Sequence, residues 1–195
     1  MGQKAGLDRD AVVAAATLIA DREGLDAATP SAVAAELGIR TPSLYYHVEG
    51  ADGLRRALAF HAAATLTSDF QAVQRDAPDQ SGADRIKLFA NAYRGFASAH
   101  PGLHAALLPA PRPGEDDELA DAMAEPVRII ALELGQGQDL TRDVVHMIRA
   151  LRSLLFGFSA IESQRGFGLE ADIDESFEVA VGLMASAIAD TTNRD

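Results

Sequence analysis

The stretch Leu37-Gly38-Ile39-Arg40-Thr41-Pro42-Ser43-Leu44-Tyr45-Tyr46-His47-Val48 carries the signals that decide the fold. Gly38 stands where a short alanine-rich helix, opened by Thr29 and Pro30, must end and the chain must turn. A second short helix begins at Thr41-Pro42, because proline fits the first turn of a helix. Two short helices joined by a tight turn predict a helix-turn-helix. The apolar residues expected to hold them together are Val33, Leu37, Ile39 and Leu44.

Most of the remaining chain also has the pattern of helices, because alanine is abundant and glycine and proline divide the sequence into helical lengths. Further helices are expected over residues 8–22, 51–73, 83–99, 103–108, 115–134, 140–162 and 174–190. We therefore expect an all-α fold of about nine helices. An N-terminal three-helix head with the helix-turn-helix would span residues 1–50, and a larger helical-bundle body would span residues 51–195.

The composition is that of a globular protein and narrows the function classes. Of 195 residues, 48% are hydrophobic and 24% charged, which excludes a disordered chain. The absence of cysteine excludes disulfides, thiolate metal sites and cysteine nucleophiles. We find no phosphate-binding loop, dinucleotide fingerprint, nucleophile elbow or zinc-protease spacing, so neither an enzyme nor a cofactor is expected. No run of eighteen apolar residues and no secretion signal occurs, which predicts a cytoplasmic protein without a membrane partner.

The charge balance bears on whether the protein binds nucleic acid. The formal net charge is −12, which opposes binding to phosphates. Residues 1–60 contain six basic and eight acidic side chains, a net charge of −2, so the other 135 residues contribute −10. The acidity lies mainly outside the helix-turn-helix, although the head itself is not basic.

The second helix of the helix-turn-helix offers side chains suited to DNA. Thr41, Ser43, Tyr45, Tyr46 and His47 supply hydroxyl, aromatic and imidazole groups that can reach base edges and phosphates in a major groove. The alternative is a structural corner between helices, with the tyrosines in the core. Two adjacent tyrosines on a helix point about 100° apart, so both cannot be equally buried.

At these residues the sequence resembles the TetR family of transcriptional regulators, over residues 8 to about 60. The turn and the Leu44-Tyr45-Tyr46-His47 core carry the resemblance. It implies that one set of side chains faces DNA, and that Ser31 and Arg40 lie near phosphates or flanking bases. The implied DNA-facing residues are Thr41, Pro42, Ser43, Tyr45, Tyr46 and His47.

The sequence departs from the family at the start of the fourth helix. The family usually places a phosphate-binding lysine there, whereas this chain has Glu49-Gly50-Ala51-Asp52. The free amides of that helix can still hold a phosphate, but the two carboxylates repel it. Weak non-specific binding is therefore expected. The basic side chains that would supply it are Lys4, Arg9, Arg40, Arg55 and Arg56.

The two C-terminal helices have apolar residues on more than one face. Each of these faces must pack against protein to be shielded from water. One subunit can bury one face, and a second copy of the chain can bury the other, which predicts a homodimer. The resemblance also implies that the last two helices of each subunit form the interface. The expected interface residues are Leu151, Leu155, Phe158, Phe177, Val181, Met184 and Ile188. On the first of these helices a second stripe comprises Met147, Leu154 and Ile161, and on the last helix Val179, Leu183 and Ala187 lie beside the main stripe. Residues 152–158, 165–168 and 174–177 also resemble one C-terminal subclass of the family.

The resemblance further implies a small-molecule effector site in the helical body, apolar with a few polar anchors. The candidate lining residues, each also a candidate core residue, are Phe89, Tyr93, Phe96, His100, His104, Leu107, Met123, Met147 and Phe156. The i, i+4 spacing of His100 and His104 is that of a metal pair. Because His100 precedes Pro101 it should lie outside the helix, so no metal site is expected.

These observations predict a sequence-specific DNA-binding regulator: a repressor that binds double-stranded operator DNA as a homodimer and is released by a small-molecule effector. The alternative is a helical ligand-binding or partner-binding dimer that has lost DNA binding. The acidic balance and the missing lysine before residue 52 motivate that alternative.

Overall fold

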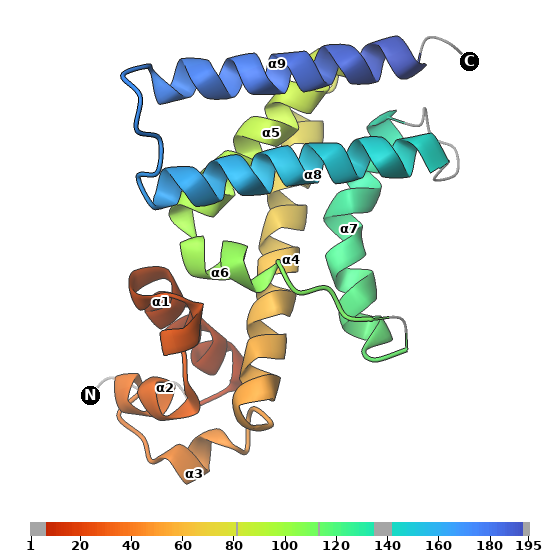
Figure 1. Ribbon diagram of the computed structural model, residues 1–195. Coiled ribbons are helices and arrows are strands. Elements are labelled where there is room, and N and C mark those ends of the chain that lie inside the picture. Colours follow the sequence, from red (N-terminus) through yellow and green to blue (C-terminus); the bar gives the residue numbers. More distant parts are fainter. Residues whose placement is uncertain (1–6, 81, 113, 135–141, 193–195) are drawn as a thin grey trace. The chain divides into compact units, whose positions relative to one another are not determined.

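The computed structural model describes residues 7–80, 82–112, 114–134 and 142–192, and within these ranges the chain is helical without a strand (Figure 1). The expected all-α class is confirmed. The elements are α1 (Arg9–Glu23), a 3-10 turn η1 (Leu25–Ala27), α2 (Pro30–Glu36), α3 (Thr41–Leu44), α4 (Gly50–Asp76), α5 (Gly82–Ala99), α6 (Pro101–Ala106), α7 (Asp117–Leu134), α8 (Arg142–Ser163) and α9 (Ile173–Thr192).

The chain packs as two compact units. The first unit contains Met1–Ala64 and Ala99–Met123, and the second contains Thr65–Ser98 and Ala124–Asp195. The first unit thus includes the expected 1–50 head and also takes in the first part of α4, the helix α6 and the start of α7. Both α4 and α7 contribute residues to each unit.

The helix α1 begins and packs as its sequence predicts. The side chain of Asp8 accepts a hydrogen bond from the amide of Ala11 at 2.8 Å and so caps the free N-terminal amides. The stripe at spacings of three and four is fully buried in the first unit, where α1 packs against α2 and α6. The residues of this stripe are Val12, Ala15, Ala16 and Ile19.

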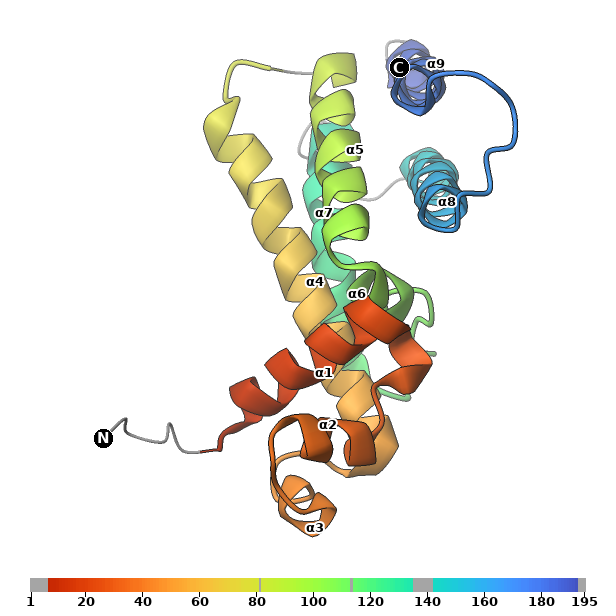
Figure 2. The ribbon, with the colours of Figure 1, turned by 90° about the vertical axis from the view of Figure 1, so that its left-hand side faces the viewer.

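The contact between α1 and α6 is unusually close and lies within the first unit (Figure 2). A Cβ atom placed on Gly102 would overlap the backbone carbonyl group of Ala20. Beside this contact, the carboxylate of Asp21 accepts hydrogen bonds from the amides of Gly102 at 2.9 Å and Leu103 at 3.4 Å. Its other oxygen lies 2.8 Å from Nδ1 of His100. A side chain of α1 therefore caps the N-terminus of α6.

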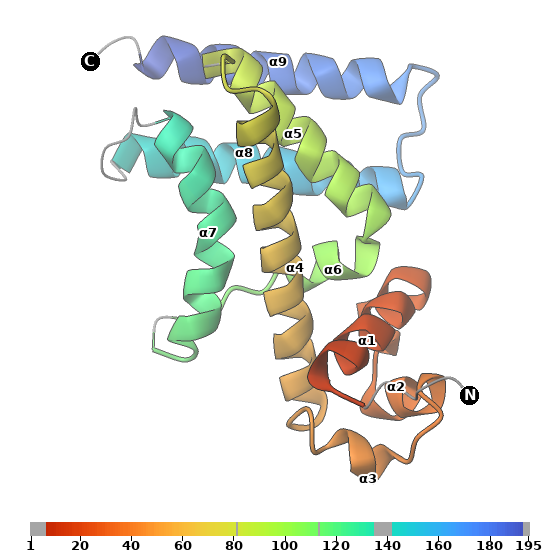
Figure 3. The same cartoon turned by 180° about the vertical axis from the view of Figure 1, so that it is seen from behind.

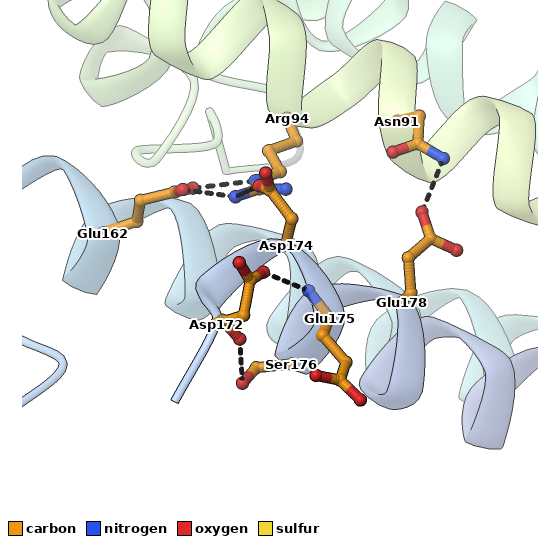
Figure 4. A network of polar contacts seen from close by, with 8 residues as sticks. All are labelled: Asn91, Arg94, Glu162, Asp172, Asp174, Glu175, Ser176 and Glu178. Carbon is orange, nitrogen blue, oxygen red and sulfur yellow. Dashed lines mark hydrogen bonds and ion pairs between the residues drawn. The ribbon is translucent and has the colours of Figure 1, made fainter. Parts of the chain in front are cut away.

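In the second unit, an arginine of α5 binds residues of α8 and α9. Figure 4 shows Arg94 between carboxylates of Glu162 at the end of α8 and Asp174 at the start of α9. The guanidinium also lies over the rings of Phe177, at 4.7 Å, and Phe158, at 5.7 Å. Its charge is satisfied on one side by carboxylates and on the other by aromatic faces. One side chain thus joins α5 to the two C-terminal helices, which lie far from it in sequence.

One described helix, α8, meets the length and composition of a membrane span, with a mean hydropathy of 1.4. Only 28% of that window is buried inside the chain. Arg149 and Arg152 stand near its middle and are exposed, and charged side chains at the centre of a bilayer are costly. α8 also packs along α9 within the second unit (Figure 3).

Replacing Gly102 tests the close approach of α1 and α6. Gly102→Ala is expected to lower the free energy of unfolding by about 1–3 kcal/mol, because the new methyl group must displace backbone. The measurement is chemical denaturation followed by circular dichroism at one fixed protein concentration. The matched control is Gly95→Ala in α5, where an added Cβ meets nothing within 4 Å. This change should be neutral or stabilising by about 0.5–1 kcal/mol. Equal stability of the two variants would contradict the packing.

Candidate DNA-binding interface

The turn of the helix-turn-helix depends on Gly38. The amide of Gly38 donates to the carbonyl of Ala35 at 3.1 Å, and the amide of Ile39 donates to the carbonyl of Ala34 at 2.9 Å. This pair of bonds is a Schellman motif, which satisfies the last carbonyls of α2. Gly38 has φ +67°, a left-handed conformation that favours glycine. The chain therefore leaves α2 in a fixed direction.

The helix α3 is shorter than the sequence indicated. Its α-helical residues are Thr41–Leu44, and residues 45–47 form a turn in which the amide of His47 donates to the carbonyl of Leu44 at 2.9 Å. The expectation of a helix continuing through His47 was therefore wrong in extent. The Leu44 side chain is fully buried, as is Val33 of α2, so the segment is held by its apolar contact.

The segment presents its polar and aromatic side chains outward. Tyr46 is 89% exposed and Tyr45 is 52% exposed, so the alternative in which both belong to the core is excluded. Arg40 and Pro42 are exposed beside them. Thr41, Ser43 and His47 are half-buried, and Ser31 is exposed in the first turn of α2. The surface offers hydroxyls and aromatic rings, which suit base edges and phosphates in a groove.

The charge near this surface is mostly acidic or already neutralised. Glu49 and Asp52 are exposed at the start of α4, where Gly50 has φ +70°. Free amides at this helix start attract a phosphate, and the two carboxylates oppose it. The acidic start of α4 therefore weakens the general attraction to DNA.

Two arginines expected to bind phosphates have partners within the protein. Arg55 pairs with Asp26 of η1 at 2.8 Å. Arg56 donates to both oxygens of Asp116 and to Glu118 at 2.8 Å. These bonds raise the pKa of Arg56 and lower the pKa of Asp116. Arg55 and Arg56 each pair with a carboxylate distant in sequence, which partly neutralises their charge.

Within the part of the chain that the structure describes, two other arginines of the expected set have no partner and can bind phosphates. The guanidinium groups of Arg9 and Arg40 have neither an ion pair nor a hydrogen bond within the described ranges. Arg22, by contrast, pairs with Glu23 at 2.8 Å. Lys4 lies outside the described residues. Of these two free arginines, Arg40 directly precedes α3.

Comparison with known proteins places the chain in a family. The family profile described as the tetracyclin repressor-like C-terminal domain matches residues 86–184. The uncharacterized HTH-type transcriptional regulator YobS of Bacillus subtilis is 30% identical over 188 residues, which cover 96% of this chain and 96% of YobS. The uncharacterized HTH-type transcriptional regulator Rv0681 of Mycobacterium tuberculosis is 32% identical over 177 residues, which cover 89% and 77% of the two chains.

The chain belongs to the TetR family of transcriptional regulators. Among solved structures, that of BioQ with its natural double-stranded DNA operator has a TM-score of 0.67 to this chain. Its sequence is 23% identical, and the alignment covers 94% of this chain and 98% of that one. This likeness shows a shared fold. The resemblance found in the sequence is thus confirmed at the level of the family.

Most of the residues expected at a dimer interface are buried within the single chain. Five of them are at most 2% exposed in a single chain, where they form the core of the second unit. Phe158 and Met184 are half-buried. These five side chains are covered by their own chain, and their assignment to a dimer interface stays a prediction. They are Leu151, Leu155, Phe177, Val181 and Ile188.

Several residues of the neighbouring apolar stripes of α8 and α9 are exposed in this unit. On α9, Leu183 is 71% exposed and Val179 is 57% exposed, one helical turn apart. On α8, Ile161 is 45% exposed and Leu154 is half-buried, two turns before it on the same face. Large apolar side chains gathered on one face mark a contact surface. We call these four residues the exposed α8–α9 stripe.

The expected effector residues divide between the two units. Phe89, Tyr93, Phe96, Met147 and Phe156 belong to the second unit, and His100, His104, Leu107 and Met123 belong to the first. In the second unit, burial raises the pKa of Tyr93 to about 12, while nearby Arg152 of α8 partly offsets the rise. In the first unit, burial lowers the pKa of His104 to about 4.

The two histidines do not share a helix face for a metal. His100 is the N-cap of α6 with φ −132° and ψ 66°, so it lies outside the helix as expected. His104 is buried inside α6, whereas His100 faces Asp21. Their i, i+4 spacing therefore does not place both rings on one side of a helix.

The free guanidinium of Arg40 gives a test of the charge analysis. Arg40→Gln is expected to reduce the slope of log K against log salt by about 0.9, because one phosphate contact is lost. The measurement is a fluorescence titration of duplex DNA at several salt concentrations. The control is Arg112→Gln, an exposed arginine paired with Glu115 in the loop before α7, which should leave the slope unchanged. An unaltered slope for Arg40→Gln would show that Arg40 does not contact phosphate.

Proposed function

We propose that this TetR-family regulator represses transcription by binding a palindromic operator as a homodimer, and that a small molecule releases it. The observation that carries the proposal is the exposure of Tyr45 and Tyr46 on a segment anchored by the buried Leu44. A rigid segment with exposed hydroxyl and aromatic groups suits insertion into a major groove. In this proposal the protein works in the cytoplasm, on chromosomal DNA.

The side chains assigned to DNA have different roles in the proposal. Tyr45, Tyr46 and Ser43 would contact base edges or the phosphates that flank them. Arg40 and Ser31, exposed on either side of the turn, would contact phosphates and fix the register. Thr41, Pro42 and His47 complete the surface. Since little free positive charge is present, specific contacts must supply an unusually large share of the affinity.

In the proposal, dimerisation gives the DNA-binding surface its sequence specificity. One short segment contacts few base pairs, whereas two copies spaced by one turn of DNA read two half-sites. The exposed α8–α9 stripe is our proposed interface, because Val179 and Leu183 expose large apolar side chains on one helix face. A twofold axis would bring the same stripe of a second copy against it.

The proposed effector site lies among the buried aromatics of the second unit. Phe89 and Phe96 are almost fully buried, and the Tyr93 hydroxyl between them in sequence is a polar group in apolar surroundings. The Ser159 hydroxyl on α8 is also buried and has no hydrogen-bond partner within the described ranges. A ligand hydrogen-bonded to such groups would gain both affinity and orientation.

Release would follow from a difference in the effector's affinity for two states of the protein. A ligand that binds more tightly to a state unsuited to the operator lowers operator affinity by that difference. The alternative function is that of a helical partner-binding dimer that has lost DNA binding. The net charge of −12 and the exposed Glu49 and Asp52 favour that alternative.

A titration of the DNA beside the protein's own gene separates the two functions. The intact protein should bind this DNA selectively over a scrambled duplex of equal length. Tyr46→Ala should weaken the selective binding by about 10- to 100-fold, the cost of one lost base contact, and leave the scrambled duplex unaffected. Because Tyr46 is 89% exposed, the variant should keep its stability. Leu108→Ala, an exposed apolar residue of the first unit, is the control. Absence of selective binding at low salt would favour the partner-binding alternative.

A charge placed in the exposed α8–α9 stripe tests the dimer. Leu183→Glu should raise the dimer dissociation constant by more than about 100-fold, because an unpaired carboxylate would be buried in the interface. Analytical ultracentrifugation measures this shift, and operator affinity should fall with it. Leu108→Glu places the same charge on an exposed leucine elsewhere and should change neither quantity. If Leu183→Glu remains a dimer at the concentrations of the parent protein, the interface lies on another face.

A further inference from the structure

Two rows of side chains, one on α8 and one on α9, begin with opposite charges and continue into the exposed α8–α9 stripe. On a helix surface, residues four apart form a ridge. All members of the two ridges are exposed except Gly157, which is half-buried, so their own chain buries neither ridge. The α8 ridge comprises Arg149, Ser153, Gly157 and Ile161, and the α9 ridge comprises Glu175, Val179, Leu183 and Ala187.

The two helices lie side by side in the second unit and run in opposite directions (Figure 1). Two contacts show which of their residues are level. The ring centroids of Phe158 and Phe177 lie 5.0 Å apart, and Glu162 and Asp174 both bind Arg94. Each step toward the N-terminus of α8 is therefore matched by one step toward the C-terminus of α9.

This register places the two charged ridge ends on opposite sides of an apolar centre. Leu154 of α8 is level with Val181 of α9, which is midway between the two large apolar residues of the α9 ridge. At 1.5 Å per residue, Arg149 lies about 8 Å from this level toward one end, and Glu175 lies about 9 Å from it toward the other. The two charges are therefore too far apart to form an ion pair within one chain.

Both charges lack a partner in the part of the chain that the structure describes. The guanidinium of Arg149 and the carboxylate of Glu175 form neither an ion pair nor a hydrogen bond there. Figure 4 shows the Glu175 carboxylate pointing away from Arg94. A twofold axis that passes between the two ridge ends exchanges them, so the arginine of each copy meets the glutamate of the other. The charges are thus complementary to a second copy of this chain.

The sizes of the other ridge residues are complementary in the same alignment. With the charged ends together, each large apolar residue lies opposite a small residue of the other ridge. A Cβ atom on Gly157 would meet nothing within 4 Å, so the chain's own packing does not require glycine there. Ridges of residues four apart commonly interdigitate between packed helices. The opposed pairs are Ser153 with Val179, Gly157 with Leu183, and Ile161 with Ala187.

We propose that two copies of this chain associate with the α8 ridge of each against the α9 ridge of the other, and that Arg149 pairs with the partner's Glu175 at both ends. This inference rests on the homodimer of the proposed function. It goes further by naming the contacts that fix the register and select the partner. A related chain without an acidic residue at the second position would leave the arginine unpaired and would be a poorer partner.

Reversal of the two charges, one at a time and together, tests the pairing in the full-length protein. Arg149→Glu and Glu175→Arg each place two like-charge contacts in a homodimer. Each should raise the dimer dissociation constant by about 10- to 100-fold, since two ion pairs are lost and two repulsions are gained. A mixture of the two variants should form heterodimers with nearly the parent affinity, because both contacts then join opposite charges. The double variant should also dimerise like the parent.

Analytical ultracentrifugation with one variant fluorescently labelled measures homodimers and heterodimers separately. The control is Arg128→Glu, the same reversal at an exposed arginine of α7 in the second unit, which should leave the dissociation constant unchanged. A variant that merely misfolds would not be rescued by a chain that carries the other change. Single variants that dimerise like the parent, or a mixture no tighter than either variant alone, would overturn the pairing.

The space at Gly157 gives a second, independent test. Gly157→Leu should raise the dimer dissociation constant at least tenfold, because the new side chain occupies the place of the partner's Leu183. Gly95→Leu makes the same change at an exposed glycine of α5 and should have no effect. If Leu183→Glu dissociates the dimer while the charge reversals and Gly157→Leu do not, the ridge alignment is wrong and the proposed interface stands. If none of these changes weakens the dimer, both fail.

Discussion

The surface that carries Tyr45 and Tyr46 depends on the burial of Leu44. A helix of four residues, Thr41–Leu44, has no stability of its own, because the first turn of a helix costs more entropy than it returns. Its conformation comes from the buried leucine at its end and from the glycine turn at its start. The neighbouring tyrosines can then be exposed without becoming disordered. The same anchoring allows a short segment to serve as a precise surface, since its side chains stand on a fixed backbone.

The charges of the first unit determine how much of the affinity for DNA can come from attraction to phosphates. Intramolecular carboxylates hold Arg55 and Arg56, and acidic residues stand at the start of α4. These ion pairs reduce the positive charge that the two arginines can offer to phosphates. In our proposal the protein would gain little from counterion release, so its non-specific binding would be weak and its discrimination between sequences would depend on hydrogen bonds and shape. Most of the acidity lies outside residues 1–60, which contribute only −2 to the net charge of −12.

The helices were predictable because local signals fix them: Asp8 and Thr29 cap α1 and α2, and spacings of three and four mark the buried face of α1. The C-terminal end of α3 was not predictable from the sequence, since tertiary packing ends that helix. Periodicity finds apolar stripes without saying which one the chain itself covers. Phe177 is buried in the core, whereas Leu183 is exposed. The pairing of Arg56 with Asp116 joins residues sixty positions apart, and no local pattern contains it.

A hydroxyl-radical footprint of the operator bound by the full-length protein tests the central claim most directly. A symmetric pair of reading segments should protect two patches on one face of the duplex, with centres about 10 base pairs apart. A single patch, or protection spread evenly along the DNA, would contradict the account.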